Sequence, residues 1–272
     1  MKILQVIILG IVQGIAEFLP VSSSAHLIIF RDVFGIANFI KGDMELAFDL
    51  ALHFGTVLAI LLFFSKDIIE MIKNGFSKEK VHKKGGNLLW LIVVATIPAG
   101  IAGVLFEDTI EGFFRNNYLL ISFSLIFMGI VLYLCDKKSK TNRKMKDLDF
   151  KDAIIIGLSQ VFALIPGFSR SGTTISAARA LRLNRKDAAK FSFYMSLPVV
   201  LGACVLKLMK GSTWALIAAN SGIFIIGILS SFITGILTIK LLLKYLDTHN
   251  FKIFMIYRIL ISVVVILVTT LA

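Results

Sequence analysis

Long apolar segments dominate this sequence of 272 residues and restrict the folds that are open to it. A helix of about 20 apolar residues is long enough to cross the hydrocarbon core of a bilayer. Five segments approach this length without difficulty: 88–106, 118–135, 191–206, 214–239 and 253–271. A sixth, 48–64, is usable but carries Asp49 and His53 near one end. The sequence therefore predicts an all-α integral membrane protein with six transmembrane helices.

The composition agrees with a membrane protein and argues against other classes. Hydrophobic residues make up 57% of the chain, and the mean hydropathy is +0.86, which is too apolar for a soluble domain of this size. The net charge of +12 is spread over short connections, so no nucleic-acid partner is predicted. Cys135 and Cys204 lie in apolar stretches without metal-type spacing, which favours neither a disulfide nor a zinc site.

Two further apolar segments are interrupted by polar residues. Residues 3–34 are broken by the polar stretch 17–26, and residues 153–183 are broken by 166–174. Irregular polar backbone at membrane depth is tolerated only where it lines a cavity inside the protein. We therefore predict that each segment is a re-entrant helix hairpin with its polar break at the tip.

The two halves of the chain resemble each other. Gly10-Ile-Val-Gln13, followed by Pro20-Val-Ser-Ser-Ser, matches Gly157-Leu-Ser-Gln160, followed by Pro166-Gly-Phe-Ser-Arg-Ser. A hairpin and three spans in each half place the second copy on the opposite face, which is an inverted-topology repeat. The predicted single membrane domain, 1–272, thus contains repeat one (1–135), a basic loop (136–152) and repeat two (153–272).

Lysine and arginine residues predict the orientation. They are concentrated in loops 65–87 and 136–152, which are therefore expected to face the cytoplasm. In the six-span arrangement of an inner-membrane protein, this places both termini outside. The two hairpins then enter from opposite sides, and their tips meet near the middle of the bilayer.

The first tip carries a carboxylate. Gln13 and Glu17 are four residues apart and share one helix face. A carboxylate at membrane depth is a candidate functional group, so Glu17 is expected to bind a divalent cation or handle a proton, with Gln13 as a neutral helper. The alternative is a structural hydrogen-bonding pair or a glutamate at the membrane interface.

Hydroxyls and a histidine follow this carboxylate. Ser22, Ser23 and Ser24 can cap a helix that runs to about Phe34. His26 lies three residues beyond Ser23, so the imidazole and the hydroxyl are expected to pair as base and nucleophile, or the imidazole activates a water. A structural role for His26 is the alternative.

The second tip is equipped to bind an anion. Arg170 is a fixed cation at the expected start of a helix, where backbone N–H groups attract phosphate. Its neighbours are hydroxyl donors and glycines that let the backbone approach closely: Gly167, Ser169, Ser171, Gly172, Thr173 and Thr174. This half is expected to clamp the anion on which the first half acts.

Three other polar residues receive structural interpretations. For Asp49 and His53, near the outer end of a span, helix packing or interface placement is favoured over lining a cavity. Arg258 lies near the cytoplasmic end of the last span and is expected to snorkel to the interface.

These motifs resemble the undecaprenyl pyrophosphate phosphatase family, also called the bacitracin-resistance proteins. The matching segments are 13–26, 48–59 and 166–174, and the likeness in length and span order extends over the whole chain. The resemblance implies removal of the terminal phosphate from a C55 polyprenyl diphosphate, which recycles the lipid carrier for peptidoglycan synthesis and confers bacitracin resistance.

The resemblance also implies roles for individual residues. Glu17 corresponds to a glutamate associated with Mg²⁺ or Ca²⁺, and Gln13 stands where many members have a second glutamate. Ser23 and His26 correspond to catalytic residues. The resemblance assigns the diphosphate to Arg170 with Ser169, Ser171 and Thr174. From their places at the two tips, Gln13, Ser22, Ser24, Gly167 and Thr173 are also expected to bind the substrate.

A transporter is the alternative from another class. Inverted repeats, broken helices and an anion site at the midplane also occur in secondary carriers, and a polyprenyl-phosphate flippase fits this description. A carrier does not need a nucleophile beside a base, so the Ser23–His26 pair favours an enzyme. A lipid substrate and the bilayer are the expected partners, and a homo-oligomer remains open.

Overall fold

A computed structural model describes residues 1–78, 87–114, 117–141, 143–209 and 211–271. Within these ranges the chain is helical, with an isolated bridge between Arg143 and Leu183 and no strand. Among the described residues, six helices are long and apolar enough to cross a membrane, which confirms the predicted all-α membrane class. Residues 79–86 and 142, within the predicted cytoplasmic loops, and Ala272 lie outside the described residues.

Most of the expected spans are present with small shifts of their ends. The six spanning helices are α3 (Asp43–Phe63), α5 (Leu88–Phe114), α6 (Tyr118–Lys138), α9 (Arg185–Leu208), α11 (Ser221–Tyr245) and α12 (Lys252–Leu271). The predicted span 214–239 differs, because it is divided between α10 (Gly211–Ala219) and α11. Asn220 lies at the break, where its side chain donates to the Leu216 carbonyl and competes with helical hydrogen bonding.

The two interrupted segments are broken where the sequence predicts. The first consists of α1 (Lys2–Ala16), α2 (Ser23–Ile28) and a π-helical turn, η1 (Ile29–Val33). The second consists of α7 (Phe150–Val161), a 3₁₀ turn, η3 (Phe162–Leu164), and α8 (Arg170–Ala180). We call residues 17–24 the first tip and residues 165–172 the second tip. An amphipathic helix, α4 (Ser65–Gly75), and a short 3₁₀ turn, η2 (Met145–Asp147), complete the described elements.

Local sequence explains why the second segment folds in this way. Asp149 and Asp152 form a capping box at the start of α7, each side chain accepting from the backbone N–H of the other. At the start of α8, Ser169 Oγ accepts from Gly172 N at 3.1 Å. Both caps satisfy backbone donors that a helix start leaves free.

Glycines allow the interrupted segments to approach the spans. α1 packs along α11, and α7 packs along α5. A Cβ on Gly14 of α1 would lie 2.7 Å from Thr234 Cβ on α11, and a Cβ on Gly157 of α7 would lie 2.9 Å from Ala95 Cα on α5. Small residues at such contacts allow close backbone packing, the main source of helix association in a bilayer.

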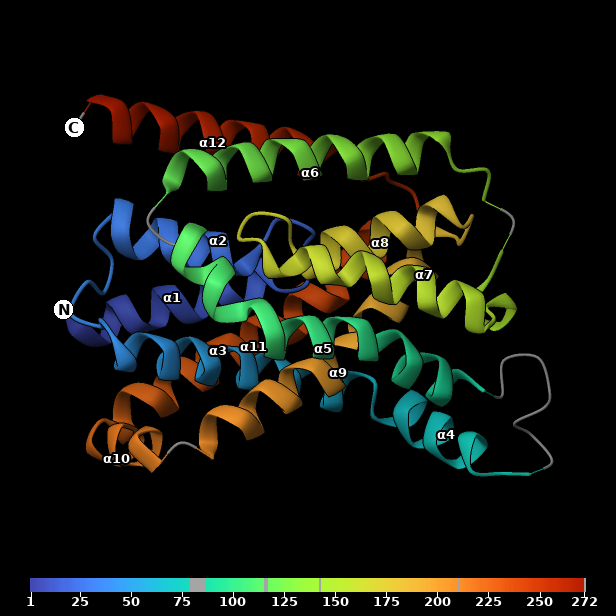
Figure 1. The fold of residues 1–272 in the computed structure, drawn as a ribbon, viewed down its shortest axis with the longest axis horizontal. Coiled ribbons are helices and arrows are strands. Elements are labelled where there is room, and N and C mark those ends of the chain that lie inside the picture. The colour runs from blue at the N-terminus through green and yellow to red at the C-terminus, as the bar shows by residue number, and fades with distance from the viewer. Residues whose placement is uncertain (79–86, 115–116, 142, 210, 272) are drawn as a thin grey trace.

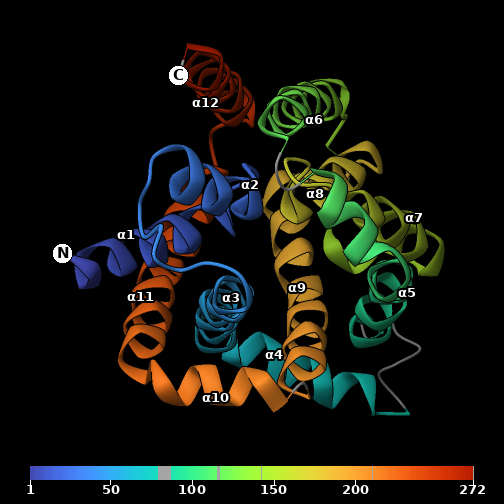
Figure 2. The ribbon, with the colours of Figure 1, turned by 60° about the vertical axis from the view of Figure 1, so that its left-hand side comes forward.

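The arrangement of the helices places the tips between two pairs of spans (Figure 2). α6 packs against α12 on one side of the tips, and α3 packs against α9 on the other. The N-terminus and the end of α12 lie at the same end of the molecule, whereas the connection from α6 to α7 lies at the opposite end (Figure 1).

A buried ion cluster fixes that opposite end. Asp136 of α6 accepts hydrogen bonds from Arg179 Nε of α8 at 2.7 Å and from Arg185 Nε of α9 at 2.8 Å. The Asp136 side chain is 2% exposed, so its charge is neutralised by these partners and not by water. The cluster thereby anchors α8, the helix that begins at the second tip.

Candidate functional site

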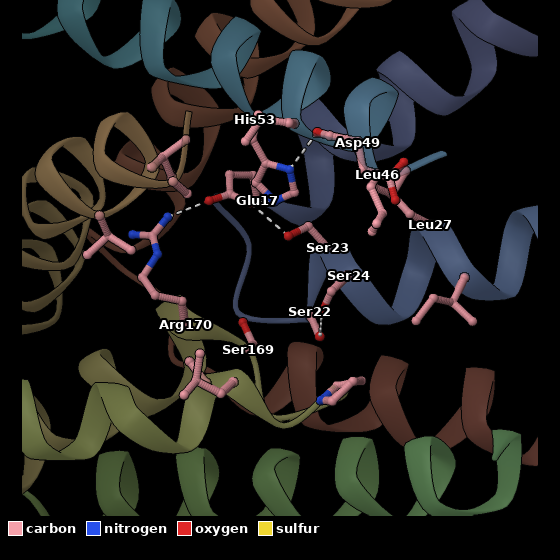
Figure 3. A pocket seen from close by; sticks show the side chains of 18 of the residues that line it. Glu17, Ser22, Ser23, Ser24, Leu27, Leu46, Asp49, His53, Ser169 and Arg170 are labelled. Carbon is pink, nitrogen blue, oxygen red and sulfur yellow. Dashed lines mark hydrogen bonds and ion pairs between the residues drawn. The ribbon is translucent and has the colours of Figure 1, made fainter. Parts of the chain in front are cut away.

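A pocket of about 380 Å³ lies where the two tips meet α3 and α9. Its apolar wall comes mainly from Leu46 and Leu50 of α3 and from Val200, Ala203 and Leu206 of α9. The polar side chains that line it lie around Glu17 (Figure 3). They are Glu17, Ser22, Ser23, Ser24, Asp49, His53, Ser169 and Arg170.

Glu17 is the centre of the polar side. Its Oε1 accepts from Arg170 Nη2 at 2.6 Å, which joins the first tip to the second. Its Oε2 accepts from Ser23 Oγ at 2.7 Å and from Gln13 Nε2 at 3.1 Å. His53 Nε2 lies 3.4 Å from the same oxygen. The arrangement balances the buried carboxylate with a guanidinium and with neutral donors.

The structure does not bring His26 to Ser23. His26 Nδ1 lies 2.7 Å from the carbonyl oxygen of Ser22, and Nε2 lies 2.8 Å from Tyr257 Oη. The imidazole is buried and does not line the pocket. The helix α2 is short and lies between the pocket and α12, so its first residue, Ser23, faces Glu17 while His26 faces α12.

The Arg170 side chain is positioned by the first tip and by α9. Nη2 binds Glu17, and Nη1 donates to the Ser192 carbonyl at 2.7 Å. Ser169 also lines the pocket, where it takes a left-handed conformation with φ of 71°. The predicted anion clamp therefore contributes one cation and one hydroxyl to the pocket.

The other predicted contacts of the second tip differ from expectation. Thr173 and Thr174 are buried outside the pocket, and both hydroxyls donate to the Arg170 carbonyl, because a hydroxyl in a helix readily bonds the preceding turn. Ser171 Oγ instead donates to the Leu19 carbonyl at 3.2 Å and joins the tips. Gly167, with φ of 101°, packs against α6, where a Cβ would lie 2.7 Å from Ser124 Cβ. None of these side chains lines the pocket.

Sequence reasoning undervalued the polar residues of α3. Asp49 and His53 both line the pocket, contrary to the favoured packing interpretation. Asp49 is bound by Arg31 of η1, whose Nη1 also donates to Glu45 at 2.5 Å. The four-residue spacing of Asp49 and His53, one helical turn, is the signal that places both on the pocket face.

Arg258 also differs from expectation. Its side chain is fully buried and does not snorkel. Nη2 donates to the carbonyls of Gly167 and Phe168, at 3.2 and 3.0 Å. An arginine within a predicted span was the available signal, since ionisable groups at membrane depth are usually functional.

The pocket offers few ligands for a metal ion. In the part of the chain that the structure describes, no group of three or more His, Cys, Asp or Glu side chains is arranged to hold a metal. Glu17 already accepts from Arg170 and Ser23, and Asp49 is paired with Arg31. A divalent cation at Glu17 would therefore need most of its oxygen ligands from a bound phosphate group or water.

Comparison with known proteins places the chain in a family. Residues 6–264 match the family described as bacitracin resistance protein BacA. An undecaprenyl-diphosphatase of Caldicellulosiruptor bescii is 43% identical over 265 residues, 97% of each chain. Undecaprenyl-diphosphatases of Moorella thermoacetica and Idiomarina loihiensis are each 42% identical, over 98% and 97% of this chain and 98% of theirs. On this similarity over nearly its whole length, and with both tip motifs in one pocket, the chain belongs to the BacA family.

Proposed function

We propose that the protein is an undecaprenyl-diphosphatase, which hydrolyses the C55 diphosphate to undecaprenyl phosphate and inorganic phosphate. The observation that carries the proposal is that Glu17 contacts both Ser23 and Arg170 inside a pocket with apolar walls. The relatives named as this enzyme support the assignment. This reaction recycles the lipid carrier for peptidoglycan synthesis and gives resistance to bacitracin.

The lining of the pocket suits a polyprenyl diphosphate. Its polar side offers a guanidinium, hydroxyls and an imidazole to the diphosphate. The apolar wall includes Ala203 and Leu206, both exposed toward the surface that lipid would cover, where an isoprenoid chain can lie. A water-soluble phosphate ester would not need this wall.

The chemistry follows from the contacts of Glu17. Ser23 Oγ attacks the terminal phosphorus and gives its proton to Glu17 Oε2, the oxygen to which it already donates. The bond from the terminal phosphorus to the bridging oxygen breaks, and undecaprenyl phosphate leaves. Water then cleaves the phosphoserine and releases phosphate. Arg170 stabilises the charge on the transferring group, because phosphoryl transfer depends mainly on positioning and charge neutralisation.

A divalent cation, Mg²⁺ or Ca²⁺, is part of this proposal. It would be held by Glu17 and would neutralise charge on the diphosphate. The cation and Arg170 would share one carboxylate, so the cation is expected to arrive with the substrate and not to remain in the free protein.

We also propose that both interrupted segments are re-entrant and that the halves form an inverted repeat in the bacterial inner membrane, with both termini outside. Ser22 and Ser169 support this, since they are 147 residues apart and both occupy the N-cap position of a helix with a positive φ, 77° and 71°. Gly10 and Gly157, also 147 residues apart, provide the close contacts of α1 with α11 and of α7 with α5.

Phosphate release from farnesyl diphosphate by detergent-purified protein tests the proposed function. We expect release in Mg²⁺ or Ca²⁺, and loss of most activity in EDTA that returns when the cation is restored. A protein that releases no phosphate from any polyprenyl diphosphate over a range of cation concentrations would favour the flippase alternative.

A further inference from the structure

Two neighbouring residues of α12 are connected to the tips, Tyr257 through His26 and Arg258 directly. Tyr257 Oη lies 2.8 Å from His26 Nε2, and His26 Nδ1 lies 2.7 Å from the Ser22 carbonyl. A carbonyl oxygen only accepts, so Nδ1 carries a proton and Nε2 of the neutral ring accepts from Tyr257. The imidazole thereby links α12 to the backbone of the first tip.

Arg258 makes the corresponding contact with the second tip. Nη2 donates to the carbonyls of Gly167 and Phe168. The guanidinium reaches them past Gly129 of α6, where a Cβ would lie 3.1 Å from Arg258 Cδ. Arg258 is fully buried, and no carboxylate among the described residues pairs with it. A buried cation without an acidic partner is costly, so its retention calls for a role at the tip.

Both tips need contacts that hold their backbone in place, because the N-cap residue of each tip has a strained backbone conformation. Ser22 and Ser169 have φ of 77° and 71°, the left-handed region that costs a residue with a Cβ about 1 kcal/mol or more. Each is followed directly by a residue of the site, Ser23 in the first tip and Arg170 in the second. Relaxation of either cap would turn the following side chain away from Glu17.

We propose that Tyr257 and Arg258 form a clamp that holds both tips in the conformation in which Ser23 and Arg170 meet Glu17. In this account His26 is a positioning residue, which passes the restraint from Tyr257 to the Ser22 carbonyl. The proposal rests on the proposed phosphatase function for its effect on turnover, but the clamp itself is a property of the fold.

The contacts of His26 argue against a direct role in proton transfer. Both ring nitrogens are hydrogen-bonded, His26 is 3% exposed, and the imidazole does not line the pocket. A general base must reach the proton that it removes. Ser23 instead donates to Glu17.

Substitutions at His26 separate the two roles. An asparagine amide can occupy the place of Nδ1 and donate to the Ser22 carbonyl, but it cannot transfer a proton. We expect kcat of His26→Asn to stay within about tenfold of wild type, and kcat of His26→Ala to fall about 100-fold, the usual cost of a misplaced reacting group. Equal losses in both variants would overturn the positioning role.

A double-mutant cycle tests the path through the imidazole. Tyr257→Phe removes the hydroxyl that binds Nε2 and should lower kcat in the wild-type background. In the His26→Asn background the same change should have almost no effect on kcat, because asparagine has no Nε2 to bind the Tyr257 hydroxyl. Full additivity of the two substitutions would contradict the clamp.

Amide hydrogen exchange tests the clamp without relying on activity. Arg258→Met should raise the exchange rate of the backbone amides about tenfold at residues 167–172 and leave that of residues 22–26 unchanged. Tyr257→Phe should raise the rate at residues 22–26 and leave that of residues 167–172 unchanged. Gly129→Leu, which displaces Arg258 without removing a polar group, should reproduce the Arg258→Met pattern, whereas Gly100→Leu, where a side chain meets open space, should not. Unchanged exchange at both tips would overturn the clamp, even if the wild type released phosphate; the expected pattern would support it even if no phosphate were released.

Discussion

At the scale of single residues, the site depends on how one carboxylate is shared. Glu17 accepts from Arg170 through one oxygen and from Ser23 through the other. The sequence identified all three residues, because charges and clustered hydroxyls are rare in an apolar chain. It paired Ser23 with His26, whereas Ser23 donates to Glu17. Spacing along a helix does not reveal that His26 hydrogen-bonds to Tyr257 of α12 and faces away from the pocket.

Arg170→Lys tests the geometry of the cation. Lysine keeps the charge but cannot reach Glu17 and the Ser192 carbonyl with one planar group. We expect kcat/KM for phosphate release to fall about tenfold or more, which corresponds to roughly 1.4 kcal/mol of transition-state stabilisation. Arg182→Lys, at an exposed position, is the matched control. Wild-type turnover by Arg170→Lys would mean that only a positive charge is needed.

Ser23→Ala tests the nucleophile. If Ser23 attacks phosphorus, kcat should fall by about 100-fold or more, because the hydroxyl that donates to Glu17 and forms the covalent intermediate is lost. Ser24→Ala removes a hydroxyl that also lines the pocket but hydrogen-bonds to the Ser22 hydroxyl, and it should lower kcat little. A loss below about tenfold in Ser23→Ala would indicate that water attacks directly.

At the scale of elements, the sequence predicted the spans and the breaks because their signals are strong. Twenty apolar residues indicate a membrane helix, and a proline with clustered serines indicates an interruption. The break at Asn220 was missed, because a single polar residue in a long apolar run is a weak signal. The roles of Thr173 and Thr174 were also missed, since a helical hydroxyl satisfies itself on the preceding turn without any trace in the pattern.

Gly14→Leu tests the packing of α1 on α11. A side chain there would overlap Thr234 and the backbone of α11, so the helices would have to separate. We expect a loss of about 1–3 kcal/mol or more, the usual cost of overpacking, seen as a lower midpoint of thermal unfolding in detergent. Gly100→Leu places the same side chain in open space and should leave the midpoint nearly unchanged. Equal midpoints for both variants would show that α1 is not closely packed.

At the scale of the whole molecule, the orientation in the membrane rests on the lysine asymmetry. After replacement of Cys135 and Cys204, cysteines at Lys78 and Lys140 should be shielded from an impermeant thiol reagent in intact cells. A cysteine at Lys41, near the start of α3, should be labelled. All three positions are exposed, so burial does not explain a difference. Ready labelling at Lys78 or Lys140 would contradict the proposed topology.

Product analysis with undecaprenyl diphosphate tests the central claim most directly. Purified wild-type protein should yield undecaprenyl phosphate and inorganic phosphate in equal amounts. Glu17→Gln, which keeps the shape of the side chain but removes the charge that pairs with Arg170 and accepts the proton of Ser23, should reduce both products about 100-fold or more. Unchanged substrate with the wild type, or release of pyrophosphate in place of phosphate, would contradict the account.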